Sequence, residues 1–264
     1  MILGFIGCGH MGGALVRAAA PSGAEILVSE HHPEKIAALL QQGLIRSVGA
    51  EELVRASDFL FLGVKPQAFP SLFETLVPLL AKRERPPVLV SMAAGIRLDA
   101  ILARVGETVP VLRILPNLAV AAGKGLILYT PSKAVTEEQE RQFLSILKAG
   151  GLFDRIREEQ MDAGCAVSGC GPAFVYEFLR AVVAGGEACG LSREQASRYA
   201  IQMLKGAAEK IPCGEDALEE EIRAICSPGG STVEGVKVLR ASDLQEVVCR
   251  AVRASCERNR ELGK

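Results

Sequence analysis

The chain has 264 residues, of which 49% are hydrophobic and 23% charged, and its 30 basic and 31 acidic residues give a formal net charge of −1. This balance is typical of a globular protein and provides no basic field that would hold a nucleic-acid backbone or an anionic membrane. No apolar run approaches the ~20 residues of a membrane span, and the first residues are typical of a strand and not of a signal peptide, so we expect a cytoplasmic protein.

Residues 1–157 alternate short apolar runs with helical patterns. Most of these runs are uninterrupted, which is typical of strands buried on both faces of a sheet. The expected strands are Ile2–Ile6, Glu25–Ser29, Phe59–Gly63, Val88–Met92 and Val109–Leu115, with weaker ones at Leu126–Tyr129 and Leu152–Ile156, and the expected helices include Pro33–Gln42, Pro66–Leu80 and Thr136–Ala149. This alternation predicts an α/β domain with a Rossmann-like, doubly wound parallel sheet.

Residues 158–264 carry no strand signal and predict an all-α domain. Its breaks fall at Gly169–Pro172, Gly190–Ser192, Pro212–Gly214 and Ser227–Gly230. The segment Phe174–Cys189 is apolar almost all round, so a helix there must be covered on every side. Because roughly one hundred residues cannot bury such helices alone, we expect a homodimer in which two helical domains enclose each other.

The eight cysteines lie mostly in apolar, helix-like stretches, and no two of them form a CxxC pair. With only three histidines in the chain, we expect no metal site. We interpret the cysteines as reduced core thiols in a reducing compartment.

A glycine-rich turn follows the first expected strand and opens a helix, with the sequence Ile6-Gly7-Cys8-Gly9-His10-Met11-Gly12. In this GxGxxG pattern Gly7 would permit the tight turn, Gly9 would let the backbone approach a pyrophosphate, and Gly12 would let the helix pack on the strand. The pattern is weak alone, and a turn without ligand is the alternative. Its place after a buried strand favours a dinucleotide site formed by these seven residues.

Glu30 follows the second expected strand, 18 positions after Gly12, close to the ~20 expected for the acid that binds the adenosine ribose. A carboxylate there accepts from both ribose hydroxyls and repels a 2′-phosphate, which favours NADH. His31 and His32 would offset that repulsion if protonated. We therefore expect NAD(P)H as cofactor, with Glu30 and His31 at the ribose and a preference for NADH; the alternative for Glu30 is a solvated loop acid.

Two further strand ends are candidates for the nicotinamide, because ligands of open α/β sheets lie beyond the carboxyl ends of the strands. The expected strand Phe59–Gly63 ends at Gly63 and leads into Val64, Lys65 and Pro66. The expected strand Val88–Met92 ends at Met92 and leads into Ala93 and Ala94. Small residues there leave room for a flat ring. The alternative in each case is an ordinary strand-to-helix turn.

The helical domain contains Ser227-Pro228-Gly229-Gly230-Ser231-Thr232 before a helix. Ser231 and Glu234 have capping-box spacing, which explains the serine but not the two glycines. Such a run offers free backbone amides and two hydroxyls to an anion. We expect Gly229–Thr232 to bind a small carboxylate.

Taken in order, these motifs resemble the pyrroline-5-carboxylate reductase family over nearly the whole chain. The similar segments are Phe5–Gly12, Val64–Pro66, Ala93–Gly95, Pro116-Asn117, Ser168–Ala173 and Ser227–Thr232. The first is shared by many dehydrogenases, whereas the last two in this order are close to diagnostic. The resemblance implies reduction of the cyclic imine 1-pyrroline-5-carboxylate to L-proline by hydride transfer from NAD(P)H, the final step of proline biosynthesis. It also implies a homodimer, often assembled into decamers.

The resemblance implies roles for single residues as well. The amides of Gly229, Gly230, Ser231 and Thr232 would bind the substrate carboxylate, and the Thr232 hydroxyl would be the catalytic group at the ring nitrogen. The loops at Gly63–Pro66 and Met92–Ala94, together with Asn117, would contact the cofactor. The chain departs from the family pattern at Leu118, Ala119 and Cys170, which concerns the shape of the substrate pocket and leaves the dinucleotide site intact.

Other functions fit parts of the pattern. The departures leave open a related cyclic imine as substrate, and a non-catalytic dinucleotide sensor would keep the fold, although it needs no carboxylate loop. A β-hydroxyacid or secondary-amine dehydrogenase would need a catalytic lysine in the helical domain, but Lys205 and Lys210 have no supporting motif. Lys65 is the alternative acid, and its place beside Pro66 favours cofactor contact or packing.

Overall fold

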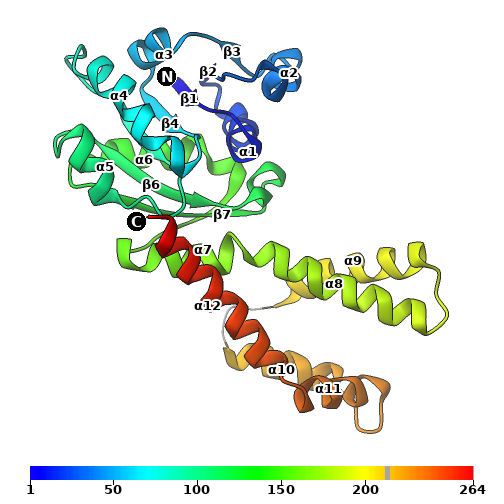
Figure 1. The fold of residues 1–264 in the computed structure, drawn as a ribbon. Coiled ribbons are helices and arrows are strands. Elements are labelled where there is room, and N and C mark those ends of the chain that lie inside the picture. The colour runs from blue at the N-terminus through cyan, green and yellow to red at the C-terminus, as the bar shows by residue number, and fades with distance from the viewer. Residues whose placement is uncertain (212–214, 264) are drawn as a thin grey trace. The chain divides into compact units, whose positions relative to one another are not determined.

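The structure is a computed structural model that describes residues 1–211 and 215–263 (Figure 1). It divides into two compact units. The sheet unit comprises Met1–Cys170 and the chain from Arg253 onward, and the helical unit comprises Gly171–Val252. Each unit is described by itself below.

The division differs from the expected boundary after residue 157. Helix α7 (Met161–Ser168) belongs to the sheet unit, because Met161 is fully buried in one apolar cluster with Leu115 and Leu128. The end of the last helix also belongs to it. Residues at both ends of the expected helical domain therefore complete the core of the sheet unit.

The sheet unit is built on one sheet of eight strands. They are β1 (Ile2–Ile6), β2 (Glu25–Ser29), β3 (Arg46–Ser47), β4 (Phe59–Leu62), β5 (Val88–Ser91), β6 (Val111–Pro116), β7 (Gly125–Pro131) and β8 (Gly151–Arg155), in the spatial order β3-β2-β1-β4-β5-β6-β7-β8. All seven expected strands are present. The two-residue β3 gives too short a pattern to be found from sequence.

The sheet differs from a fully parallel one in one place. Strand β7 runs antiparallel to β6, whereas β8 is again parallel to β7. Only residues 117–124 connect β6 to β7, and a parallel crossover needs a dozen residues or more. The short link, which contains the 3-10 helix η3 (Leu118–Ala122), therefore turns the chain back on itself.

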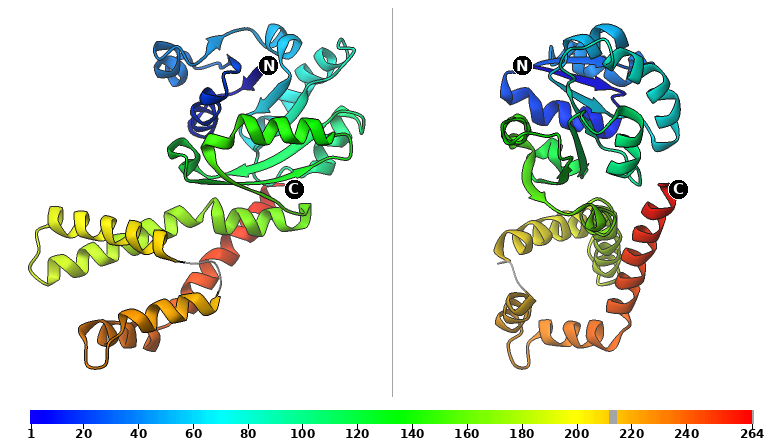
Figure 2. Two further views of the ribbon diagram at one scale, coloured as in Figure 1. Left: turned by 180° about the vertical axis from the view of Figure 1, so that it is seen from behind. Right: turned by 90° about the vertical axis from the view of Figure 1, so that its left-hand side faces the viewer.

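Helices cover both faces of the sheet (Figures 1 and 2). One apolar core includes side chains of α1 (His10–Ala19), α2 (Pro33–Gln41) and α6 (Glu137–Ile146), and the other includes α3 (Ala50–Ala56), α4 (Phe69–Leu80) and α5 (Leu98–Val105). The three expected helices are present with shifted ends, while α3 and α5 were not anticipated. Cover on both faces explains why the central strands are apolar throughout.

The helical unit contains α8 (Gly171–Ala188), α9 (Arg193–Lys210), α10 (Glu215–Ile225), α11 (Ser231–Ala241) and the first part of α12 (Leu244–Leu262). Ser192 and Gln195 form a capping box at the start of α9. Large apolar side chains of this unit face outward: Tyr176 is 68% and Val238 is 71% exposed. The expected break at Pro212–Gly214 lies outside the described residues.

By length and mean hydropathy alone, one helical stretch among the described residues passes the test for a membrane span. It covers Glu158–Ala188, 31 residues with a mean hydropathy of 1.2 in its most apolar window, of which 6% is buried. Its first turns contain Met161 and Ala166, which are fully buried in the sheet unit.

The backbones of Gly7 and Gly63 approach closely where β1 and β4 end. Gly7 has a φ of +78°, which favours glycine. A Cβ placed on Gly63 would overlap the carbonyl oxygen of Gly7. Side chains are therefore excluded from both positions.

We expect Gly63→Ala to destabilise the fold by about 1–3 kcal/mol, because the neighbouring backbone must shift to admit the methyl group. Urea unfolding without cofactor, at fixed protein concentration, measures the change. The matched control is Gly13→Ala in α1, whose Cβ would meet only Leu39 at 3.9 Å and should be neutral or stabilising. Equal stability of the two variants would show that the close approach is no constraint.

Candidate active site

The glycine turn lies at the point where the chain order of the sheet reverses. Strand β1 has β2 on one side and β4 on the other. The Gly7 amide donates to the Ser29 carbonyl oxygen at 2.9 Å, and the Gly63 amide donates to the Ile6 carbonyl oxygen at 2.8 Å. These bonds tie three strand ends together at the edge where doubly wound sheets bind ligands.

The glycines of the turn have separate roles. Gly7 supplies the positive φ, and a Cβ on Gly12 would lie 3.2 Å from the Gly7 carbonyl oxygen, so the helix packs closely on the turn. A Cβ on Gly9 would meet no protein atom within 4 Å. Packing therefore does not explain Gly9, whereas room for a phosphate beside the first turn of α1 does.

Glu30 is bound to the same turn. Its carboxylate accepts from the Cys8 amide at 2.8 Å and from the His32 amide at 3.0 Å. Partial burial alone would raise the Glu30 pKa, but these two hydrogen bonds and the charges of Lys35 and His32 outweigh it and hold the pKa below its usual value. The acid at the end of β2 is thus kept ionised beside the glycine turn, while the side chains of His31 and His32 are exposed.

The cysteines near the turn and in α7 are not activated. Burial, with a smaller contribution from Glu30, raises the pKa of the Cys8 thiol to about 11. Burial, with a smaller contribution from Cys170, raises the pKa of Cys165 to about 11. Since the thiolate is the nucleophile, neither thiol is suited to covalent catalysis near neutral pH.

The two candidate nicotinamide loops follow β4 and β5 at the same edge of the sheet as the glycine turn. After β4, Gly63, Val64 and Pro66 are half-buried and Lys65 is exposed. After β5, Ala93 is buried, and Met92 and Ala94 are half-buried. The structure therefore brings both loops and the glycine turn together, as their positions after parallel strands predict.

Asn117 braces two segments of the sheet unit. Its side-chain nitrogen donates to the Ser168 carbonyl oxygen at 3.0 Å, and its side-chain oxygen accepts from the Ala119 amide at 3.2 Å. The second bond caps η3, and the first fixes the end of α7. The Asn117 amide group thus holds the Ser168 motif in place, a role that the sequence pattern does not reveal.

In the helical unit, the serine-glycine loop leads directly into α11. Gly229 has a φ of +74°, and the Gly230 amide donates to the Ser227 carbonyl oxygen at 3.0 Å. The capping box that the spacing of Ser231 and Glu234 allows does not form: Gly230 is the N-cap, Ser231 is already helical, and Glu234 pairs with Lys237 at 2.7 Å. The hydroxyls of Ser231 and Thr232 are therefore not used to cap α11, and both residues are exposed.

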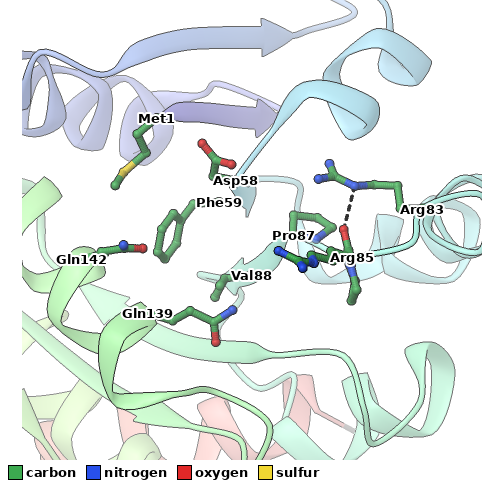
Figure 3. Close-up of a pocket in the computed structure, with 10 residues that line it drawn as sticks. Met1, Asp58, Phe59, Arg83, Arg85, Pro87, Val88, Gln139 and Gln142 are labelled. Atoms are coloured by element: carbon green, nitrogen blue, oxygen red, sulfur yellow. Dashed lines mark hydrogen bonds between the residues drawn. The ribbon is translucent and has the colours of Figure 1, made fainter.

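One cavity lies at the opposite edge of the sheet from the glycine turn (Figure 3). It has a volume of about 400 Å³ and is lined by residues at or just before the first residues of β1, β4 and β5, among them Met1, Asp58 and Pro87. Its polar groups have partners: Asp58 accepts from the Ile2 amide, and Arg83 donates to the carbonyl oxygens of Val54, Ser57 and Arg85. This cavity is therefore separate from the candidate active site.

A buried ion cluster in the sheet unit was missed from sequence. Arg113 on β6 is fully buried and pairs with Glu158 at 2.5 Å and with Asp162 at 3.5 Å. The available signal was the arginine itself within the apolar run Val111–Leu115, since a buried charge needs a partner. Among the described residues, no group of three or more His, Cys, Asp and Glu could hold a metal ion.

Comparison with known proteins agrees with this arrangement. A family model described as pyrroline-5-carboxylate reductase dimerisation matches residues 158–262, and one described as NADP oxidoreductase coenzyme F420-dependent matches residues 2–95. The pyrroline-5-carboxylate reductase of Escherichia coli is 32% identical over 99% of this chain and 98% of its own length. The chain belongs to the pyrroline-5-carboxylate reductase family.

Further reductases of this family support the assignment. The enzyme of Pisum sativum is 31% identical over 98% of this chain and 95% of its own length. The crystal structure of the Plasmodium falciparum enzyme, with NADP bound, has a TM-score of 0.89 and 28% identity and covers 100% of this chain and 98% of that chain. The similarity thus extends over both units.

Proposed function

We propose that the chain reduces 1-pyrroline-5-carboxylate to L-proline with NAD(P)H, the last step of proline biosynthesis. The observation that carries the proposal is the presence of both the open glycine turn and the serine-glycine loop in a chain that aligns over nearly its full length with these reductases. A sensor that only bound a dinucleotide would not need the second loop. The departures at Leu118, Ala119 and Cys170 keep a related cyclic imine as the alternative substrate.

The reaction needs positioning more than acid-base chemistry. The bound nicotinamide supplies a hydride, which adds to the imine carbon while the ring nitrogen keeps or takes up a proton. The amides of Gly7–Gly12 hold the pyrophosphate, and the small residues after β4 and β5 accommodate the ring. The amides of Gly229–Thr232 hold the substrate carboxylate, and the Thr232 hydroxyl hydrogen-bonds the ring nitrogen. Such orientation contributes several kcal/mol to lowering a barrier.

Thr232→Ala is expected to lower kcat/KM for 1-pyrroline-5-carboxylate by about 10- to 100-fold, which corresponds to one hydrogen bond in the transition state. Thr232→Ser keeps the hydroxyl and should retain most of the activity. The cofactor Kd should not change in either variant, because Thr232 belongs to the substrate loop. Steady-state kinetics at the absorbance of the reduced cofactor make the comparison; unchanged kcat and KM in the alanine variant would remove Thr232 from the mechanism.

We further propose a preference for NADH. The ionised Glu30 carboxylate, fixed beside the glycine turn by two amides, would accept the ribose hydroxyls and repel a 2′-phosphate. His31, His32 and Lys35 act in the opposite direction when they are charged. Because these charges oppose each other, the negative charge of Glu30 at the ribose decides which of the two cofactors is preferred.

Glu30→Gln should shift the ratio of kcat/KM for NADH over NADPH toward NADPH by about tenfold, the effect of ~1.4 kcal/mol of charge repulsion. Glu74→Gln is the matched control, because it removes the same charge from an exposed acid on α4, and it should change the ratio less than twofold. A tenfold preference of the wild type for NADPH would contradict the proposal.

We also propose that the helical unit forms a soluble homodimer, which is able to assemble further into decamers, in the cytoplasm. Outward-facing Tyr176 and Val238 lie within the residues matched by the dimerisation model. A second copy suits the apolar stretch ending at Ala188 better than a bilayer, because Glu177 and Arg180 pair with each other near the middle of α8. The seven described cysteines are free thiols, which fits a reducing compartment.

Light scattering should therefore give a mass of twice 28.0 kDa, or an even multiple of the monomer. Tyr176→Asp should reduce that mass toward the monomer, because it places a charge among apolar side chains. Leu152→Asp is the control: Leu152 is 74% exposed on β8 of the sheet unit, and its replacement should leave the mass unchanged. A monomeric wild type would contradict the proposal.

A further inference from the structure

The loop Met92–Arg97, between β5 and α5, is backed by the end of the chain's last helix. Gly95 is buried and has a φ of +81°. A Cβ on Gly95 would lie 2.8 Å from the carbonyl oxygen of Asn259 and 2.8 Å from the amide nitrogen of Gly263. A Cβ on Gly263 would in turn overlap the carbonyl oxygen of Gly95. The last turn of α12 thus lies directly against this loop within the sheet unit.

A second fixed point lies at the far end of the same loop. The Leu98 amide donates to Glu158 Oε1 at 3.1 Å, and that oxygen is also the one that binds the buried Arg113. The pairing of Glu158 with Arg113 prevents the carboxylate from turning toward water. The middle of the loop and its far end are therefore held by residues that come at least 60 positions later in the chain.

The two fixed points share one cluster. Asn259 on α12 is only 7% exposed, and its side-chain nitrogen donates to the carbonyl oxygen of Asp162 at 3.2 Å. The carboxylate of Asp162 lies 3.5 Å from the Arg113 guanidinium. Arg113 thus connects, through its two acidic partners, to the loop at Leu98 and to the helix end that backs Gly95.

We propose that the last turn of α12, Asn259–Gly263, is a positioning element that fixes the loop Met92–Ala94 at the depth required for hydride transfer. Ala93, Ala94 and Gly95 have at most a methyl group each with which to hold the backbone in place, so the close contact between the Gly95 backbone and the end of α12 helps to set the position of the loop. Misplacement by about 1 Å can cost on the order of 10²-fold in rate. The inference rests on the proposed function for the placement of the nicotinamide at this loop.

Two variants disturb the contact between the end of α12 and the loop, each through a different residue. Asn259→Ala removes the hydrogen bond to Asp162, and Gly263→Ala places a methyl group against the Gly95 carbonyl oxygen while leaving the ion cluster intact. The control is Arg260→Ala, on the same turn, whose side chain is exposed. If Asn259→Ala fails to fold, Gly263→Ala alone decides the question.

Three measurements on the full-length protein test the proposal. Hydrogen exchange at residues 92–98, without cofactor, should become about tenfold faster in both variants. The Kd for NADH, from its fluorescence, should rise several-fold, and single-turnover hydride transfer should slow about tenfold, while the KM for the imine stays unchanged. Arg260→Ala should match the wild type throughout.

The outcomes separate the two claims. Unchanged exchange in both variants would overturn the contact, and faster exchange with unchanged hydride transfer would overturn its positioning role. A wild type that does not oxidise NADH with 1-pyrroline-5-carboxylate would contradict the proposed function. In that case the exchange rates and the NADH Kd still decide whether the turn of α12 fixes the loop for cofactor binding.

Discussion

The backbones of Gly7 and Gly63 are in contact at the carboxyl ends of β1 and β4, and the proposed cofactor site depends on this close approach. A side chain at either position would push the strand ends apart. Because these two backbones lie so close together, the first turn of α1 begins beside the open space at Gly9. The hydrogen bond from the Gly7 amide to the Ser29 carbonyl oxygen holds the end of β2 beside the turn, where Glu30 accepts from the Cys8 amide. These two contacts place the amides proposed to bind phosphate, the acid proposed to bind the ribose and the first loop proposed to contact the nicotinamide at a single edge of the sheet.

The buried ionisable groups of the sheet unit named here are not poised for acid-base or nucleophilic chemistry. The thiols of Cys8 and Cys165 have raised pKa values, and the fully buried Arg113 is paired with two carboxylates. The groups proposed to face the ligands are mainly backbone amides and small side chains, with the Glu30 carboxylate at the ribose and the Thr232 hydroxyl at the substrate. This composition suits a reaction in which an electrophilic imine needs only to be oriented toward a hydride donor.

Much of the sheet unit was predictable because its central strands are covered on both faces and are therefore apolar without interruption. The glycine turn was predictable because each of its glycines meets a separate steric requirement. Local patterns could not give the antiparallel β7, which follows from a link too short for a crossover, or the packing of α7 and the end of α12 on the sheet. The spacing of Ser231 and Glu234 allowed a capping box, but the Glu234 carboxylate forms an ion pair with Lys237 one turn later. Asn117 and Arg113 act through partners about 50 positions away, which no local pattern reveals.

Transfer of deuterium from NADH in which both hydrogens at C4 of the nicotinamide are replaced by deuterium tests the central claim most directly. The protein is incubated with labelled cofactor and 1-pyrroline-5-carboxylate, and the product is analysed by mass spectrometry and NMR. The account predicts L-proline with one deuterium, on the ring carbon that was the imine carbon, for each cofactor oxidised. Proline without deuterium, or no oxidation of the cofactor when both substrates are present, would contradict it.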